Sequence, residues 1–299
     1  MYRKRNKLLL DHFFRRIFGE KKITPRNRVV IIHNHLFKNA GSTIDWSLRR
    51  NFGKDFVDHR DDGNMRRGAD YLGPYLAEHP AVKALSTHHL VLPLPVLNNT
   101  RLLMMLMLRH PIERIQSVYN FERKQKHAST PGAIHARKYS LSEYVEWRMR
   151  PDVGATIRNY HAIRCMHGHE YTYTNGIAEK EFARAVETVQ STEMIGLVER
   201  FDESIVLFEE CLRPAFPEID LSYRIQNVGP SKDVPREERI DNLKKEVGEA
   251  VFAKLLDNNR WDLQLYTVAC REFAARVEKI NEFSQKLTSF RARCQKLRS

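Results

Sequence analysis

The stretch that decides the fold runs from residue 29 to residue 43 and reads Val-Val-Ile-Ile-His-Asn-His-Leu-Phe-Lys-Asn-Ala-Gly-Ser-Thr. Its first four residues, Val29–Ile32, are β-branched and apolar, as is typical of a strand buried on both faces in a parallel sheet. A loop of small and polar residues follows, and Ile44–Phe52 is predicted to be helical. Together these residues form a strand, a loop and a helix, which is the repeating unit of an α/β fold.

Three further apolar runs lead into polar residues in the same way: Val82–Leu85 into Ser86-Thr87-His88-His89, Leu102–Leu108 into Arg109-His110-Pro111, and Met194–Val198 into Glu199-Arg200. Helices are predicted after the second and third of these runs, over 111–126 and 203–211. The helix over 111–126 begins with Pro111, and proline suits the first turn of a helix. Strands that alternate with helices predict a mostly parallel sheet flanked by helices on both faces. In such sheets ligands bind beyond the carboxyl ends of the strands, so we expect the site among these polar segments.

Composition and charge limit the class of protein. With 299 residues, of which 42% are hydrophobic and 10% aromatic, the chain can bury a sizeable core, which excludes a wholly disordered protein. The net charge of +13 belongs to the ends of the chain: residues 1–30 carry ten Lys/Arg against two acidic residues, and residues 271–299 carry eight against three. Residues 31–270 are therefore formally neutral, and an anion site among them must be built from a few placed cations.

Three parts of the chain are expected: a basic N-terminal leader helix within 1–27, a main domain over 28–262 and a C-terminal helix over 263–299. The basic helix Leu8–Phe18 either lies on an anionic membrane surface or packs on its own domain. The four cysteines form no C-x-x-C pair, which favours a reducing compartment, and the apolar runs are shorter than the roughly 18 residues that span a bilayer. We therefore expect a cytoplasmic protein, with peripheral membrane contact through the leader as the alternative.

A heptad pattern runs through the C-terminal segment, which is expected to be one long helix from about Tyr266 to Leu297. The residues of the pattern recur every seven positions along two lines: Tyr266, Phe273, Ile280, Leu287 and Cys294, and Ala269, Phe283, Phe290 and Leu297, with Arg276 interrupting the second. Such a stripe fits a coiled coil between subunits, and thus a homo-oligomer, as well as it fits packing on the protein's own core.

The loop after the first strand has the features of an anion site. Lys38-Asn39-Ala40-Gly41-Ser42-Thr43 places one cation, a glycine and two hydroxyls at the start of a helix, where exposed N–H groups and the helix dipole favour an anion. It is not a Walker A loop, because there the lysine follows the glycines, whereas Lys38 precedes Gly41.

Residues 35–43, His-Leu-Phe-Lys-Asn-Ala-Gly-Ser-Thr, resemble the 5′-phosphosulfate loop of sulfotransferases, whose usual form is close to H-x-P-K-[TN]-A-G-[ST]-[ST]. That family transfers a sulfuryl group from 3′-phosphoadenosine 5′-phosphosulfate (PAPS) to an acceptor. The resemblance implies a P-loop-like sheet, PAPS as the co-substrate, and Lys38 as the catalytic cation that neutralises charge on the leaving 3′,5′-diphosphate. It also implies that the 5′-phosphate is bound by the loop residues Asn39, Ala40, Gly41, Ser42 and Thr43.

A second segment resembles the family's other signature. Residues 109–117, Arg-His-Pro-Ile-Glu-Arg-Ile-Gln-Ser, are similar to R-[DH]-P-x-x-R-x-x-S, which binds the 3′-phosphate of the donor. The resemblance gives this role to Arg109, whose planar guanidinium matches phosphate geometry, and to the hydroxyl of Ser117. His110 replaces the commoner aspartate, which would cap the following helix, so the first turn of that helix is expected to be less well held.

The acceptor hydroxyl must lose a proton as it attacks, and histidine suits that role near neutral pH. Ser86-Thr87-His88-His89-Leu90 resembles the Gly-His step that carries the base in sulfotransferases acting on uronyl and hexosamine polysaccharides, which include the heparan and uronyl 2-O-sulfotransferases. On that alignment His89 is the catalytic base, with His88 as the alternative. The resemblance implies a carbohydrate or glycan acceptor.

Two other histidines, His33 and His35, alternate along the first strand and share a face. They could hold a metal, but no third ligand is visible in the sequence, and a packed, hydrogen-bonded pair is favoured. Since sulfuryl transfer in the family needs no metal, none is expected.

The resemblance covers 29–52, 82–123 and, more loosely, 193–211, while 54–80 and 124–158 match nothing recognisable. Weaker similarities suggest nucleotide contacts by Asn227–Ser231 with Lys232 or Arg236, and an acceptor-side role for Asn159 and Arg164. The sequence thus predicts a PAPS-dependent O-sulfotransferase. One alternative is a nucleotide-dependent phosphotransferase. The other is a protein that binds polyanions or nucleic acid through its basic ends. The transferase interpretation itself predicts no nucleic-acid partner.

Overall fold

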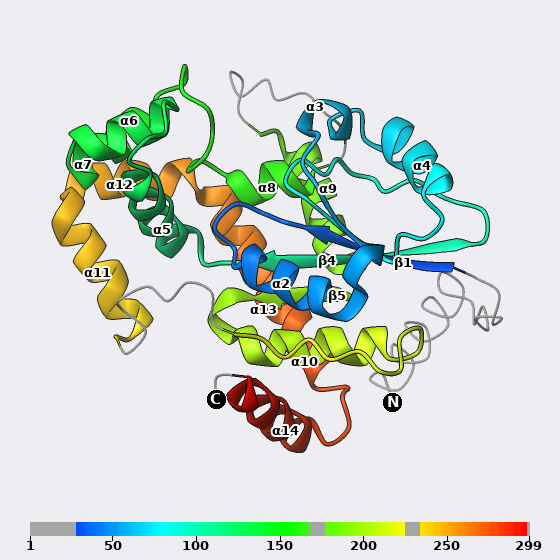
Figure 1. Ribbon diagram of the computed structural model, residues 1–299. Helices are drawn as coiled ribbons and strands as arrows, with labels where there is room; N and C mark the ends of the chain where they lie inside the picture. The colour runs from blue at the N-terminus through cyan, green and yellow to red at the C-terminus, as the bar shows by residue number, and fades with distance from the viewer. Residues whose placement is uncertain (1–27, 167, 169–176, 225–233, 298–299) are drawn as a thin grey trace, which may run out of the picture.

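A computed structural model describes residues 28–166, 168, 177–224 and 234–297. Its centre is a five-stranded sheet in the order β2-β3-β1-β4-β5, in which every neighbouring pair is parallel (Figure 1). The strands are β1 (Arg28–Asn34), β2 (Phe56–His59), β3 (Ala84–Thr87), β4 (Thr100–Leu108) and β5 (Met194–Leu197). The predicted α/β class, with a parallel sheet flanked by helices, is confirmed.

Four of the five strands coincide with the predicted apolar runs. β3 begins two residues later than predicted and extends to Thr87, because its pairing with β1 continues as far as Asn34. The edge strand β2 was missed: it is four residues long and includes Asp58 and His59, so it carries no apolar run.

Each strand faces two layers of helices, because alternate side chains point to opposite faces of the sheet. Val30 and Ile32 pack in a cluster with Leu72 and Leu76 of α4, whereas Ile31 belongs to the largest cluster, on the other face. The elements that follow β1 and β2 are α2 (Gly41–Phe52), the 3₁₀ turn η1 (Gly53–Asp55), α3 (Asp62–Met65) and α4 (Ala69–Glu78). The other helices of the main cluster are α8 (Tyr160–Cys165), α9 (Glu179–Ser191), α10 (Phe201–Leu212), α13 (Arg260–Val277) and α14 (Phe283–Lys296), with the 3₁₀ turn η2 (Val198–Arg200) before α10.

A separate apolar cluster forms beside the sheet, on the left in Figure 1. It includes buried residues of α5, α7, α11 and α12, such as Ile115, Tyr144, Leu243 and Leu255. The helices there are α5 (Pro111–Lys124), α6 (Pro131–Lys138), α7 (Leu141–Arg148), α11 (Arg236–Val247) and α12 (Glu249–Asn258). α6, α7 and the loop between α5 and α6 come from residues 124–158, for which the sequence showed no recognisable counterpart.

The prediction of one long C-terminal helix is wrong. The chain turns between α13 and α14, where Glu282 adopts a left-handed conformation with φ of 55°, and α14 packs against α10. Phe273 and Phe290, from the two lines of the heptad pattern, are both fully buried in the main cluster. Packing on the protein's own core therefore accounts for these positions, and the boundary expected between residues 262 and 263 falls inside α13.

The leader helix and its membrane contact were expected within residues 1–27, which lie outside the described residues. Within the described ranges, no helix combines the length and the apolar character needed to cross a membrane.

Candidate functional site

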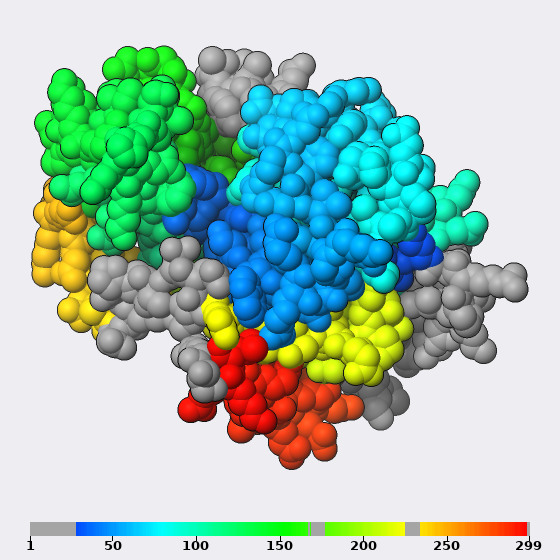
Figure 2. All heavy atoms as spheres, in the orientation of Figure 1, coloured from blue at the N-terminus to red at the C-terminus, as the bar shows by residue number. Residues whose placement is uncertain are grey.

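The loops that carry the predicted site residues leave the same edge of the sheet. β1 lies between β3 and β4, and Asn34 at its end pairs with Thr87 of β3 and Leu106 of β4. Because all three strands are parallel, the loop after β1, the histidines after β3 and Arg109 after β4 meet at their carboxyl ends. Figure 2 shows this face hollowed between the green segment that contains α6 and α7 and the blue-to-cyan segment that contains α2 and α4.

The loop after β1 presents backbone N–H groups at the start of α2. Lys38 and Ala40 adopt left-handed conformations, with φ of 64° and 61°, and Ala40 is the N-cap residue without a side-chain cap. Among the described residues, no group accepts a hydrogen bond from the N–H of Gly41 or Ser42, whereas that of Thr43 donates to the Ala40 carbonyl at 3.1 Å. Free N–H groups at the positive end of a helix dipole form an anion site.

Gly41 is required at this position because of His35. A Cβ atom on Gly41 would lie 2.1 Å from the imidazole of His35, so any larger residue would displace either the ring or the loop. The glycine therefore lets the histidine pack directly under the start of α2.

Asn39 anchors the loop instead of facing the anion site with its side chain. This residue is buried, and its amide Nδ2 donates to the Met107 carbonyl at 2.8 Å and to His161 Nε2 at 2.8 Å. His161 Nδ1 in turn lies 3.5 Å from Asp262 Oδ2. The N–H of Asn39 donates to the Leu36 carbonyl, so both of its donor groups serve the loop itself. Ser42 is exposed and Thr43 half-buried, so both hydroxyls remain available.

Lys38 projects from this loop toward α5. Its ammonium Nζ lies 4.4 Å from the centroid of the Phe121 ring. Burial, together with the positive charges of Arg109 and Lys124, lowers the pKa of Lys38. The positive charges of Lys38 and Arg109 therefore influence each other.

Arg109 lies at the end of β4 and is half-buried. Its guanidinium forms no hydrogen bond or ion pair with any part of the chain that the structure describes. Burial lowers its pKa, while the carboxylates of Glu199 and Glu113 oppose that shift. Ser117, two turns along α5, is half-buried, and its hydroxyl has no protein partner within the same ranges. Phe121 follows one turn later on the same face of the helix.

The second arginine of the motif, Arg114, has a structural role that the sequence did not reveal. It is 1% exposed, donates to the carbonyls of Phe37 and Thr156, and lies 4.1 Å from the centroid of the Tyr160 ring. Burial lowers its pKa to about 10. Arg114 thereby ties α5 to the loop that carries Lys38.

His110 gives the first turn of α5 no side-chain cap, but that turn is not left without a partner as the sequence suggested. Instead, Glu199 Oε1 accepts a hydrogen bond from the His110 N–H at 2.7 Å, and its Oε2 accepts one from the Tyr266 hydroxyl at 2.8 Å. A carboxylate from η2 thus satisfies the helix start in place of the aspartate that usually stands there.

His88 and His89 differ in their surroundings. His88 Nδ1 donates to the His35 carbonyl at 2.9 Å, and burial, reinforced by His35 and Arg60, lowers its pKa to about 4. His89 Nε2 lies 3.2 Å from Asp62 Oδ2, and its Nδ1 lies 3.5 Å from an Arg164 guanidinium nitrogen. Burial and Arg164 lower the pKa of His89, whereas the charge of Asp62 opposes the shift.

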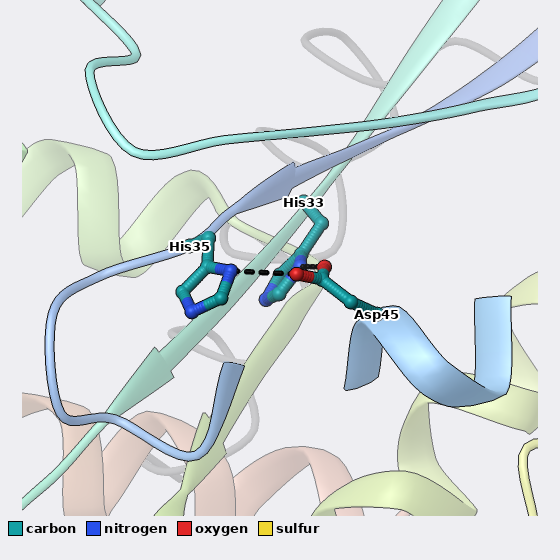
Figure 3. A group of neighbouring side chains, drawn as sticks. All are labelled: His33, His35 and Asp45. Carbon is teal, nitrogen blue, oxygen red and sulfur yellow. Dashed lines mark hydrogen bonds and ion pairs between the residues drawn. The ribbon is translucent and has the colours of Figure 1, made fainter. Parts of the chain in front are cut away.

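His33 and His35 share the carboxylate of Asp45, a partner that sequence reasoning missed (Figure 3). Each imidazole donates its Nδ1–H to one oxygen of Asp45 at 2.7 Å, and all three residues are buried. Burial lowers the pKa of His33. Although burial alone would raise the pKa of Asp45, the two histidines hold it well below its usual value. The favoured interpretation, a packed and hydrogen-bonded pair, therefore holds.

Among the described residues, His33, His35 and Asp45 also form the group that could hold a metal ion, since one ligand atom from each lies within 4.8 Å of the others. In this arrangement each Nδ1 is already committed to the carboxylate.

Two residues with weaker sequence similarities turn out to be engaged within the protein. The amide oxygen of Asn159 accepts the N–H groups of Trp261 and Asp262 at the start of α13, and Arg236 forms an ion pair of 3.4 Å with Glu113. Asn227–Ser231 and Lys232 lie outside the described residues.

Comparison with known proteins identifies an archaeal relative that is similar over most of its length. An uncharacterized protein of Archaeoglobus fulgidus is 34% identical over 258 residues, which cover 80% of this chain and 95% of the relative. The chain belongs to the same family as this archaeal protein. No family model matches the chain. No solved structure matches it either.

What the chain can do chemically follows from the geometry of its site. Within the part of the chain that the structure describes, N–H groups without an acceptor and a guanidinium without a partner lie at the ends of adjacent strands. Lys38 belongs to the same loop as the N–H groups, and His88 and His89 lie at the end of the next strand. The arrangement can hold an anion with two separated negative groups beside a base.

Proposed function

We propose that the protein transfers a sulfuryl group from PAPS to a hydroxyl of a carbohydrate acceptor. The observation that carries the proposal joins two adjacent strand ends. Among the described residues, the Arg109 guanidinium after β4 has no hydrogen-bond or ion-pair partner, and the N–H groups of Gly41 and Ser42 after β1 have no acceptor. A nucleotide with a 5′-phosphosulfate and a 3′-phosphate needs two such binding points in one site.

In this proposal the N–H groups of Gly41 and Ser42, with the hydroxyls of Ser42 and Thr43, bind the 5′-phosphate at the positive end of the helix dipole. Arg109 and Ser117 bind the 3′-phosphate, to which a guanidinium can donate two parallel hydrogen bonds. Asn39 acts indirectly, because its side chain fixes the loop to β4 and α8.

Lys38 supplies the positive charge for the reaction. In an in-line transfer the attacking and leaving oxygens lie on opposite sides of the sulfur, and negative charge accumulates on the leaving diphosphate. An ammonium that moves from the Phe121 ring to this oxygen neutralises that charge, and its contact strengthens in the transition state.

His89 is the base of the proposal, with Asp62 as the residue that orients it. Asp62 accepts from Nε2, so Nδ1 carries the lone pair that takes the proton of the acceptor hydroxyl. The hydroxyl replaces the Arg164 guanidinium nitrogen that lies 3.5 Å from Nδ1 in this structure. His88 has an open Nε2, but a pKa of about 4 makes it the weaker proton acceptor.

Calorimetry with adenosine 3′,5′-bisphosphate tests the donor site. Arg109→Ala should weaken binding roughly 10- to 100-fold, since hydrogen bonds to charged groups contribute about 1.5–3 kcal/mol each. Arg101→Ala is the matched control, because Arg101 lies near the opposite end of β4 and pairs with the exposed Glu193. Wild-type affinity in Arg109→Ala, or no binding to the unmodified protein, would contradict the proposal.

Lys38→Ala separates binding from chemistry. Its turnover with PAPS should fall about 100-fold, as for loss of a group that stabilises transition-state charge. Affinity for the bisphosphate should change much less. Phosphorylated product from ATP and Mg²⁺, with no turnover of PAPS, would instead favour a phosphotransferase.

A further inference from the structure

A cavity beside Lys38 has no assigned role. It has a volume of about 460 Å³, within the range of about 300–1,000 Å³ that is common for small-molecule sites. It is lined by residues of α5, the start of α6, the end of α7 and the loop after α7, and by Phe37 from the loop after β1. Phe121 belongs both to this cavity and to the contact with the Lys38 ammonium, so the cavity adjoins the reacting end of the site.

Aromatic rings form one part of the cavity wall. Phe121 is 38% exposed, and the Phe37 ring packs edge-on against it with 5.4 Å between centroids. Trp147, which also lines the cavity, is held by a stacked His135 at 3.8 Å. Rings fixed in this way offer flat apolar surface at little entropic cost.

Charged groups form the remainder of the wall. Glu122 and Arg148 form a buried ion pair there, and Asp152, which is mostly exposed, pairs with Arg150 at 2.6 Å. Each charged residue of this lining, Glu122, Arg148 and Asp152, therefore already has a partner of opposite charge. Because these charges are compensated within the protein, the lining favours a neutral ligand over a charged one.

We propose that this cavity binds a neutral pyranose ring of the acceptor. A pyranose has an apolar C–H face that can stack on an aromatic ring and hydroxyls that can donate to carboxylates, which matches both parts of the wall. By contrast, the side of the site near His88 and His89 is positively charged, because Arg60 and Arg164 lie there. The inference rests on the proposed function, because it names the part of the acceptor that lies next to Lys38.

Gly154→Trp fills the cavity with the least disturbance. Gly154 lines the cavity, and a Cβ atom at this position would have no heavy atom within 4 Å. Val96→Trp is the matched control, since it adds an aromatic ring at a position that is 99% exposed. Saturation-transfer NMR on the full chain measures binding of the neutral probes cellobiose, maltose and chitobiose, and calorimetry measures binding of adenosine 3′,5′-bisphosphate.

We expect at least one disaccharide to bind both the unmodified protein and Val96→Trp. The saturation-transfer signal of that disaccharide should fall at least tenfold in Gly154→Trp. Affinity for the bisphosphate should stay within twofold in the unmodified protein and both variants. Three results would overturn the inference: no signal from any disaccharide, an unchanged signal in Gly154→Trp, or a loss of bisphosphate affinity in that variant, which would mean that the cavity holds the nucleotide. Failure of the unmodified protein to bind the bisphosphate would refute the proposed function instead.

Discussion

At the scale of single residues, two side chains of the same type are distinguished by what each one contacts. His88 packs against His35 and loses most of its basicity, whereas His89 retains a carboxylate partner in Asp62. The adjacent sequence positions carry no information about this difference. The pKa of a histidine depends on burial and nearby charge, which only the folded chain supplies.

Asp62→Asn tests this distinction through the pH profile. His89 must be neutral to accept a proton, and its pKa lies below the usual value, so kcat/KM should reach its plateau at a pH below that of an ordinary histidine. Removing the negative charge of Asp62 lowers this pKa further, so the acid limb should move to lower pH while kcat falls about tenfold or more. An unchanged acid limb in Asp62→Asn, together with a larger loss of kcat in His88→Ala than in His89→Ala, would give the role of base to His88.

At the scale of elements, the helix start at α5 is stabilised by a residue 89 positions away. Glu199 replaces the cap that His110 does not provide, and it also joins α5 to α13 through Tyr266. The motif sequence identified Arg109 and Ser117, but not the carboxylate that holds the helix between them in place.

Glu199→Gln should lower the free energy of unfolding by about 1–2 kcal/mol, since a charged acceptor at a helix N-terminus is lost while one hydrogen bond can persist. Glu193→Gln is the control, because Glu193 pairs with Arg101 at the surface and such pairs contribute about 0–1 kcal/mol. Urea unfolding compares the two variants. Equal stability of the two would show that Glu199 does not hold the start of α5.

At the scale of the whole molecule, the C-terminal segment is part of the core and not an appendage. Phe273 of α13 and Phe290 of α14 are fully buried against residues of the sheet and α10. The turn at Glu282 brings α14 back onto α10, which one continuous helix could not do. Burial of these aromatic side chains outweighs the helix propensity of the segment between them.

Phe290→Ala should lower the free energy of unfolding by about 3–5 kcal/mol, the usual range for a buried phenylalanine. Val96→Ala, at an exposed site, should change it little. Thermal unfolding at several protein concentrations measures both variants. If Phe290→Ala were as stable as the unmodified protein, or lost stability only through dissociation of a dimer, the packing of α14 on its own core would be refuted.

Sequence alone determined the parallel α/β sheet, four of its five strands, and the segments at their carboxyl ends that carry Lys38, Arg109 and the histidines. These features depend on apolar runs and short loops, in which each residue acts on close neighbours. Only the tertiary structure decided which distant residues meet: Asp45 between His33 and His35, Glu199 at α5, Arg114 under the loop, and α14 on the core. Such contacts join segments far apart in the chain, and they depend on how all the elements pack at once.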